Sequence, residues 1–216
     1  MALSPYNPEM KLSNKYTLRD LTITNEPLPN MPTNEAELAN LKWLARTLED
    51  LEADFGPFKI FSAFRSPEVN AAVKNLGADA PVKKSFHEAG MAVDILPQNM
   101  SIQEMYGRIL AGPWKDKLGE IALKPTQGTL HLSLPTEKYR GVAMVMDAAG
   151  VYVRQSADQI QEFAQPYIDQ ALQAVEESVY DTDQATGEKS VKLWVWVAGG
   201  VTALGALLLM FKPKKS

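Results

Sequence analysis

The chain has only two histidines, and each is associated with a short segment that has strand alternation. His131 lies within one segment, and His87 lies shortly before the other. In residues 91–96, every second side chain is apolar, and Asp94 lies on the opposite face. In residues 129–134, three leucines alternate with a polar set that includes His131. A carboxylate on such a strand is costly unless it is paired or binds a metal. The two patterns therefore predict adjacent strands with apolar backs, whose polar fronts line a cleft.

His87 lies seven positions before Asp94, at the start of the first strand-like segment. Two imidazoles and one carboxylate leave the fourth tetrahedral position open, as in catalytic zinc sites. The chain has no cysteine, so a zinc site must use nitrogen and oxygen ligands. We therefore predict that His87, Asp94 and His131 bind one zinc ion. The alternative, for each histidine taken alone, is a solvated or hydrogen-bonded side chain.

Length and charge limit the other possibilities. A chain of 216 residues has room for one moderate domain plus appendages. Its net charge of -4 gives no reason to expect nucleic acid as a partner. The absence of cysteine also excludes disulfides, so the compartment cannot be inferred from them.

The run from Leu193 to Phe211 contains no charged residue. It is long enough to cross a hydrocarbon core of about 30 Å. Tryptophans at one end are typical interfacial anchors, and lysines flank the other end. We predict a transmembrane helix over residues 191–212 and a basic tail over 213–216. A buried core helix is the alternative, which a terminal, lysine-bounded segment that is apolar all round disfavours.

The remaining patterns predict an α+β fold: a small antiparallel sheet with flanking helices. Helices are expected after Asn34, with Glu37 completing a capping box, and after Ser66 and Ser101. Strands are expected at residues 58–64, 87–96, 119–124, 129–134, 142–146 and 151–153, and a short turn or strand at 16–23. The predicted domain covers residues 1–155, followed by an amphipathic helix at 156–180, which Pro166 should kink or divide, and a linker at 181–190.

Three motifs connect these elements to a known family. Residues 61–70 read FSAFRSPEVN, residues 85–95 read SFHEAGMAVDI, and residues 130–133 read LHLS. In this order they resemble the motifs of M15-type zinc peptidases, the D-Ala-D-Ala carboxypeptidase superfamily, in its phage and bacterial branch. The resemblance spans roughly residues 15–145 and is consistent with the predicted α+β fold.

The resemblance implies roles for individual residues. It implies zinc ligation by His87, Asp94 and His131. It also implies that Arg65 and Ser85 hold carbonyl or carboxylate groups of the substrate. As an enzyme, we expect Arg65 to fix a substrate carboxylate or to stabilise the oxyanion. The implied activity is cleavage of peptide bonds in stem peptides or cross-links of bacterial peptidoglycan, as a carboxypeptidase or an endopeptidase.

The general base departs from the family pattern. The family has a carboxylate shortly before the second zinc histidine, where this chain has Lys124, Pro125, Gln127 and Gly128. Glu120 is the nearest upstream acid and shares a strand face with Lys124, so we expect Glu120 to be the base. Glu88 is a poorer candidate. If Glu120 does not serve, the chain is a catalytically inactive, membrane-anchored structural or peptidoglycan-binding protein.

The charges around the apolar run predict its orientation. Lysines after the run indicate a cytoplasmic C-terminus, which places residues 1–190 outside, next to peptidoglycan. No apolar segment typical of a signal peptide follows the initiator. The two observations together favour a membrane-containing virion or a phage device delivered to the envelope. A stripe of small residues, Ala198, Thr202 and Ala206, predicts helix–helix packing in the membrane.

Overall fold

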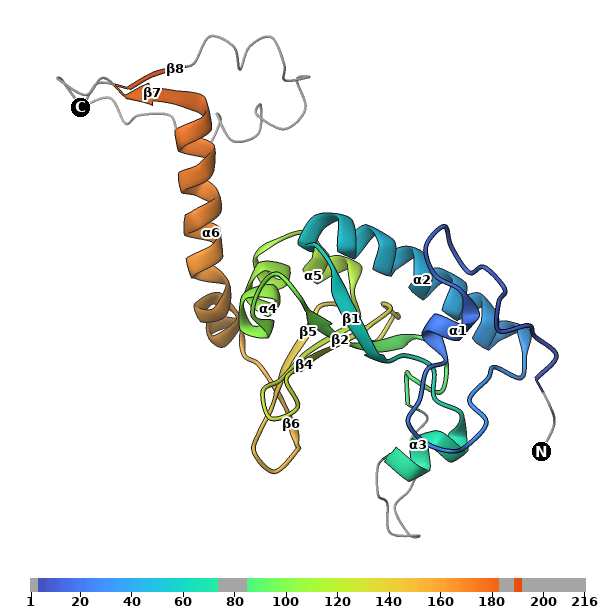
Figure 1. Cartoon of the computed structure of the whole chain (residues 1–216). Helices are drawn as coiled ribbons and strands as arrows, with labels where there is room; N and C mark the ends of the chain where they lie inside the picture. Colours follow the sequence, from blue (N-terminus) through green and yellow to red (C-terminus); the bar gives the residue numbers. More distant parts are fainter. Residues whose placement is uncertain (1–3, 74–84, 183–188, 192–216) are drawn as a thin grey trace. The chain divides into compact units, whose positions relative to one another are not determined.

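The computed structural model describes residues 4–73, 85–182 and 189–191 (Figure 1). The chain divides into two compact units between Pro166 and Tyr167. The first unit contains the whole main sheet and all the predicted site residues.

Six strands form one mixed sheet in the order β1-β2-β4-β3-β5-β6. The strands are β1 (Phe58–Ser62), β2 (Ala92–Pro97), β3 (Glu120–Lys124), β4 (Thr129–Ser133), β5 (Val142–Met146) and β6 (Tyr152–Arg154). All neighbours are antiparallel except β3 and β5, which run parallel. The α+β class is confirmed, but the expectation of a purely antiparallel sheet is wrong. The reason is that β5 joins the far side of β3 after a crossover from β4, instead of continuing a hairpin.

Helix starts follow the predicted caps closely. The helices are α1 (Leu18–Leu21), α2 (Glu35–Phe55), α3 (Pro67–Val73), α4 (Ile102–Ala111), α5 (Trp114–Lys117) and α6 (Ala157–Val179). Asn34 accepts from the backbone N–H of Glu37 at 3.0 Å, but the Glu37 carboxylate accepts from Thr33 rather than from Asn34. The expected capping box is therefore displaced by one residue. The turn or strand expected at residues 16–23 is instead the single helical turn α1, whose own capping box joins Thr17 and Asp20.

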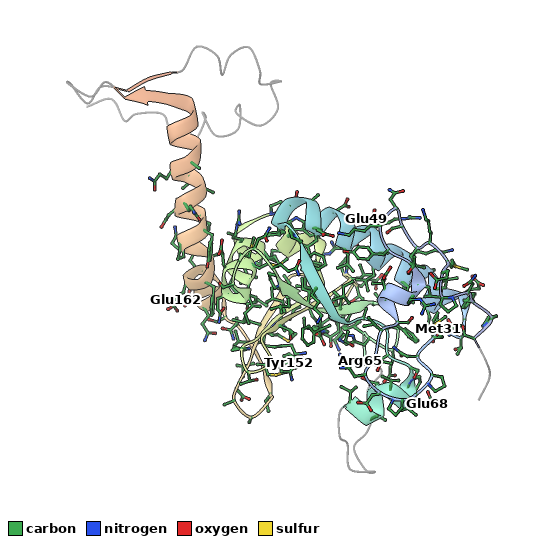
Figure 2. All side chains as sticks on the ribbon, viewed as in Figure 1. Met31, Glu49, Arg65, Glu68, Tyr152 and Glu162 are labelled. Carbon is green, nitrogen blue, oxygen red and sulfur yellow. The ribbon has the colours of Figure 1, made fainter. Side chains whose placement is uncertain are left out.

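Helices cover one face of the sheet and leave the other face for polar side chains. The apolar backs of β2 and β4 are buried, and α2 and α4 lie on that side (Figure 1). α2 turns an apolar stripe inward, with these buried residues: Leu38, Leu41, Leu44, Ala45, Leu48 and Leu51. Arg65 and Tyr152 lie on the opposite side of the sheet from Glu49 of α2 (Figure 2). The fold thus presents one open sheet face, where the site residues gather.

The segment after α6 differs from the expected linker. α6 runs through Pro166 as one helix. Where a linker was expected, β7 (Tyr180–Thr182) pairs antiparallel with β8 (Lys189–Val191). Within residues 4–73, 85–182 and 189–191, no helix is both long and apolar enough to cross a bilayer. The predicted span lies, from residue 192 onward, outside the described residues.

Candidate metal centre

Asp94 and His131 are direct partners in the β2–β4 ladder. Asp94 Oδ1 lies 3.0 Å from His131 Nδ1. Both side chains point to the open face because the apolar backs of their strands, including Val93 and Leu132, are packed inside. The prediction that the two strands are adjacent and line a cleft with their polar fronts is therefore confirmed.

His87 lies in a turn before β2. The expectation that the strand begins at His87 is therefore wrong. Met91 N–H donates to Phe86 C=O at 2.8 Å and Gly90 N–H donates to His87 C=O at 3.2 Å, which closes the turn. Gly90 has a φ of +70°, and a Cβ there would lie 2.9 Å from the Glu37 carbonyl oxygen of α2. A glycine is thus needed for the turn that brings His87 to the end of β2.

The ring of His87 is fixed in one orientation by the backbone. Its Nδ1 lies 2.6 Å from the Ala63 carbonyl oxygen, so Nδ1–H donates and Nε2 keeps its lone pair. Nε2 faces His131 Nδ1 at 3.2 Å. Burial lowers the pKa of His87 well below its ordinary value, which keeps the ring neutral. A neutral imidazole with a backbone partner on its far nitrogen is the form that ligates metals.

The spacing of the donor atoms fits a metal ion. Nε2 of His87 lies 3.2 Å from Nδ1 of His131 and 3.6 Å from Oδ2 of Asp94, and Asp94 Oδ1 lies 3.0 Å from His131 Nδ1. Atoms bound at about 2.0–2.2 Å in a tetrahedron are about 3.4 Å apart, close to the distance between the two histidine nitrogens. With one atom from each residue, the donor atoms of His87, Asp94 and His131 all lie within 4.8 Å of one another. The buried group of His87, Asp94 and His131 can therefore hold a metal ion.

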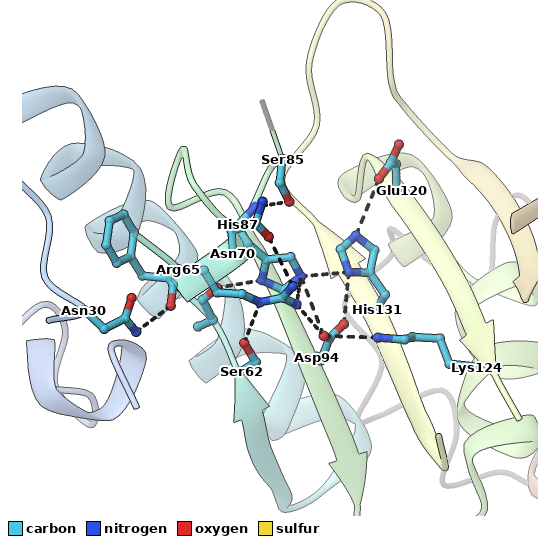
Figure 3. A network of polar contacts seen from close by, with 12 residues as sticks. Asn30, Ser62, Arg65, Asn70, Ser85, His87, Asp94, Glu120, Lys124 and His131 are labelled. Carbon is cyan, nitrogen blue, oxygen red and sulfur yellow. Dashed lines mark hydrogen bonds and ion pairs between the residues drawn. The ribbon is translucent and has the colours of Figure 1, made fainter. Parts of the chain in front are cut away.

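Two cations already contact this group (Figure 3). Arg65 Nη2 lies 2.9 Å from both His87 Nε2 and Asp94 Oδ2, and Lys124 Nζ lies 3.1 Å from Asp94 Oδ2. A lone pair that accepts an N–H bond is not free to bind a metal. Metal binding through His87 Nε2 therefore requires Arg65 to release that nitrogen, whereas the Asp94 carboxylate has further lone pairs.

Hydrogen bonds to neighbouring residues hold the Arg65 guanidinium close to His87 and Asp94. Its Nε donates to Ser62 Oγ at 2.9 Å and its Nη1 to Asn70 Oδ1 at 3.4 Å. Its backbone N–H donates to the His87 carbonyl at 3.2 Å. Ser85 belongs to the same corner, because its Oγ accepts from the His87 N–H at 3.3 Å.

Glu120 reaches the centre from β3, as the strand alternation predicted. Its Oε2 lies 3.4 Å from His131 Nε2, on the ring nitrogen farther from Asp94. Burial alone would lower the pKa of His131, but hydrogen bonds to Asp94 and Glu120 outweigh it and raise the pKa. Glu88 instead accepts a hydrogen bond from the Asn70 side chain.

Asp94 is the anionic centre of the network. Burial by itself would raise the pKa of this carboxyl. Both histidines and Lys124 outweigh that effect, and hold the pKa well below its usual range. Asp94 is therefore ionised at neutral pH, as a metal ligand must be.

A cleft of about 1010 Å³ lies over these groups. All the predicted site residues line it: Arg65, Ser85, His87, Asp94, Glu120 and His131. Large apolar side chains also line it, and Ile23, Phe61 and Tyr152 among them are 54%, 50% and 41% exposed. A polar floor with such apolar side chains is typical of a ligand site.

Three lining residues were not identified as site residues from the sequence. Lys124 was considered only as a failed base, although its strand position beside Glu120 indicated that it faces the cleft. Thr129 lies on the same face as His131 by alternation. Tyr152 has no sequence signal; its ring centroid lies 6.3 Å from that of His131, and burial raises its pKa to about 12.

Comparisons with protein-family models, with curated proteins and with solved structures find no match to this chain. The resemblance to M15-type peptidases therefore stays a prediction, which rests on the three sequence motifs. The class that the fold and site define is coarser. This is an α+β protein with a buried group of two histidines and one aspartate that can hold a metal ion.

Proposed function

We propose that this chain is a zinc-dependent peptidase that cleaves stem peptides or cross-links of bacterial peptidoglycan. The observation that carries the proposal is the buried ligand group at the floor of a cleft, with Glu120 and Arg65 both in contact with it. The motif order supplies the substrate class. Neither structural neighbours nor relatives contribute to the proposal.

His87, Asp94 and His131 would hold the zinc ion through two nitrogens and one oxygen. Zinc in such a three-ligand site supplies Lewis-acid chemistry, polarising a carbonyl and lowering the pKa of a water to about 7. The donor set fits zinc better than magnesium or calcium, which prefer oxygen ligands.

Glu120 is the acid that would move protons. Its carboxylate lies in the cleft beside His131, so it can accept a proton from a nucleophilic water and return it to the leaving amine. Arg65, released from His87 and Asp94, would hold a substrate carboxylate or stabilise the developing oxyanion. Ser85 lines the same end of the cleft and would bind a substrate carbonyl.

Localisation follows from the apolar run. Residues 193–211 would anchor the protein as a single-pass membrane protein, with the peptidase unit facing the periplasm and cell wall. A virion membrane or a phage-delivered device would be consistent with this orientation. Protease treatment of spheroplasts tests the orientation, since digestion of residues 1–190 only after lysis would contradict it.

A second candidate is a peptidoglycan-binding protein that holds metal without turnover. It is favoured by the position of Glu120, whose Oε2 contacts the nitrogen of His131 farther from Asp94. A carboxylate there can orient the histidine as an outer partner and not act as the base. The absence of an acid at residues 124–128 favours the same candidate.

Zinc content and peptidoglycan binding, measured with cleavage, separate the two candidates. The full chain in mild detergent is compared with His87→Ala and with Glu137→Gln, an exposed control outside the cleft. Zinc with cleavage supports the peptidase. Zinc and binding without cleavage support the second candidate, and equal zinc content in the parent and His87→Ala would overturn the metal centre.

A further inference from the structure

Lys124 and Thr129 form a second polar pair in the cleft, beside the metal ligands. They are direct partners in the β3–β4 ladder and are only 6% and 3% exposed. Opposed residues of an antiparallel pair have Cβ atoms about 4.5–5.5 Å apart and share one face. Both residues line the cleft, on the strands that carry Glu120 and His131.

The hydrogen-bonding capacity of this pair is not used up by the described residues. The Lys124 ammonium has three N–H donors, and within the described part of the chain Asp94 Oδ2 is the acceptor that it contacts, at 3.1 Å. Thr129 Oγ1 is buried and has no hydrogen-bond partner among the described residues. Buried polar groups in native proteins are nearly always hydrogen-bonded. The pair therefore indicates a ligand that brings its own oxygen atoms.

The chemistry of the pair favours an anion with two oxygens. An ammonium and a neighbouring hydroxyl can each donate to one oxygen of a carboxylate, and hydrogen bonds between charged groups are the stronger ones. A carboxamide offers one acceptor and no charge. A divalent metal on Asp94 would also neutralise the negative charge of that carboxylate. The positive charge of Lys124 would then favour an anionic ligand.

The pair formed by Lys124 and Thr129 is separate from the guanidinium of Arg65. Arg65 and Lys124 approach Asp94 from opposite sides (Figure 3). A ligand held at both points would extend across the metal ligands. We propose that Lys124 and Thr129 form a carboxylate-binding subsite that selects ligands with a carboxylate near the reacting bond. The inference that the ligand is a peptide rests on the proposed function. The inference that the subsite binds a carboxylate does not.

Ligand-observed NMR with acetate and acetamide tests the subsite on the full chain in detergent, with and without zinc. Acetamide is the neutral control of the same shape. We expect acetate to bind at least about tenfold more tightly than acetamide, and Lys124→Met to remove about tenfold of that affinity. Thr129→Val, which keeps every charge, should cost about threefold. Lys11→Met removes an equal charge at an exposed position and should change nothing.

Each outcome decides the inference. Equal acetate affinity in the parent, Lys124→Met and Thr129→Val would overturn the proposed subsite. Binding of acetate only to zinc would give this result. Thermal unfolding checks that Lys124→Met is folded, and Thr129→Val repeats the test without a charge change. A stem pentapeptide and its all-carboxamide form provide the second arm. If acetate binds through Lys124 and Thr129 but the pentapeptide does not bind, the subsite stands and the peptidoglycan assignment fails.

Discussion

Asp94 and His131 face each other across the β2–β4 ladder, with Oδ1 3.0 Å from Nδ1. This pair joins two motifs that are 37 residues apart in the sequence. A slip of one residue in the register would turn one of the two side chains to the apolar face. The packed leucine backs of β4 therefore fix the position of the candidate metal centre as well as the fold.

Metal binding should release a proton. The pKa of His131 is raised above the ordinary histidine value of about 6.5. At about pH 6.5, more than half of the molecules therefore carry a proton on this ring. His87 is already neutral. Because metal ligation requires a neutral ring, calorimetry in buffers of different ionisation enthalpy at that pH should show release of about 0.5–1 proton per zinc. Uptake of protons, or none exchanged, would contradict the assignment of His131 as a ligand.

Arg65→Gln should bind zinc more tightly than the parent. The guanidinium donates to two of the ligand atoms, so its removal frees both and takes one positive charge from the centre. We expect zinc affinity to rise about tenfold while any peptidase activity falls by about 10²-fold or more. Competition with a chromogenic chelator measures the affinity, and Arg108→Gln on exposed α4 surface is the control. A lower zinc affinity in Arg65→Gln would mean that Arg65 supports the ligands instead of competing for them.

Two variants of Glu120 distinguish a base from an orienting partner. Glutamine keeps an oxygen that can accept from His131 Nε2 but cannot take a proton, whereas alanine loses both functions. If Glu120 is the base, Glu120→Gln should lower the cleavage rate by about 10²–10⁴-fold and keep its zinc affinity. Glu120→Ala should also lose about tenfold in zinc affinity, since it removes the outer partner of His131. Cleavage by Glu120→Gln at the parent rate would exclude Glu120 as the base.

The free energy of unfolding without metal should be highest near about pH 6.5. Below this pH the unfolded chain protonates His87 and the folded chain, with its lowered pKa, does not, so acid favours unfolding. Above it the folded chain keeps the His131 proton that the unfolded chain has lost, so this stabilisation disappears as pH rises through the folded pKa.

Urea unfolding in chelator over about pH 5 to 8 measures this profile. The slope on either side is limited to about 1.4 kcal/mol per pH unit for one proton. His87→Gln should flatten the acid side and His131→Gln the alkaline side. A profile in which each variant flattens the other side would show that the two protonation states have been assigned the wrong way round.

Local patterns in the sequence predicted most of the first unit. The caps at Asn34, Ser66 and Ser101 are helix starts, and the alternation in residues 129–134 is β4. These features depend on neighbours within a few residues, which the sequence displays directly. The helix at 156–180 was also predicted, because its apolar stripe has helical spacing.

Long-range pairing was less accessible. Nothing within β5 indicates that it joins β3 in parallel, since that choice depends on which sheet edge is free. The contact of Arg65 with His87 and Asp94 depends on β1, a turn and β2, so it has no local signature. Lys124 and Thr129 became recognisable as a pair only through the β3–β4 register.

Mass spectrometry of muropeptides tests the peptidase proposal most directly. The zinc-loaded full chain in detergent is incubated with muropeptides beside His131→Ala, treated in the same way. The proposal predicts shortened or uncrosslinked stem peptides from the parent, and unchanged muropeptides from His131→Ala and from the parent after chelation. Unchanged muropeptides from a parent that holds one zinc per chain, or identical products from the parent and His131→Ala, would contradict it.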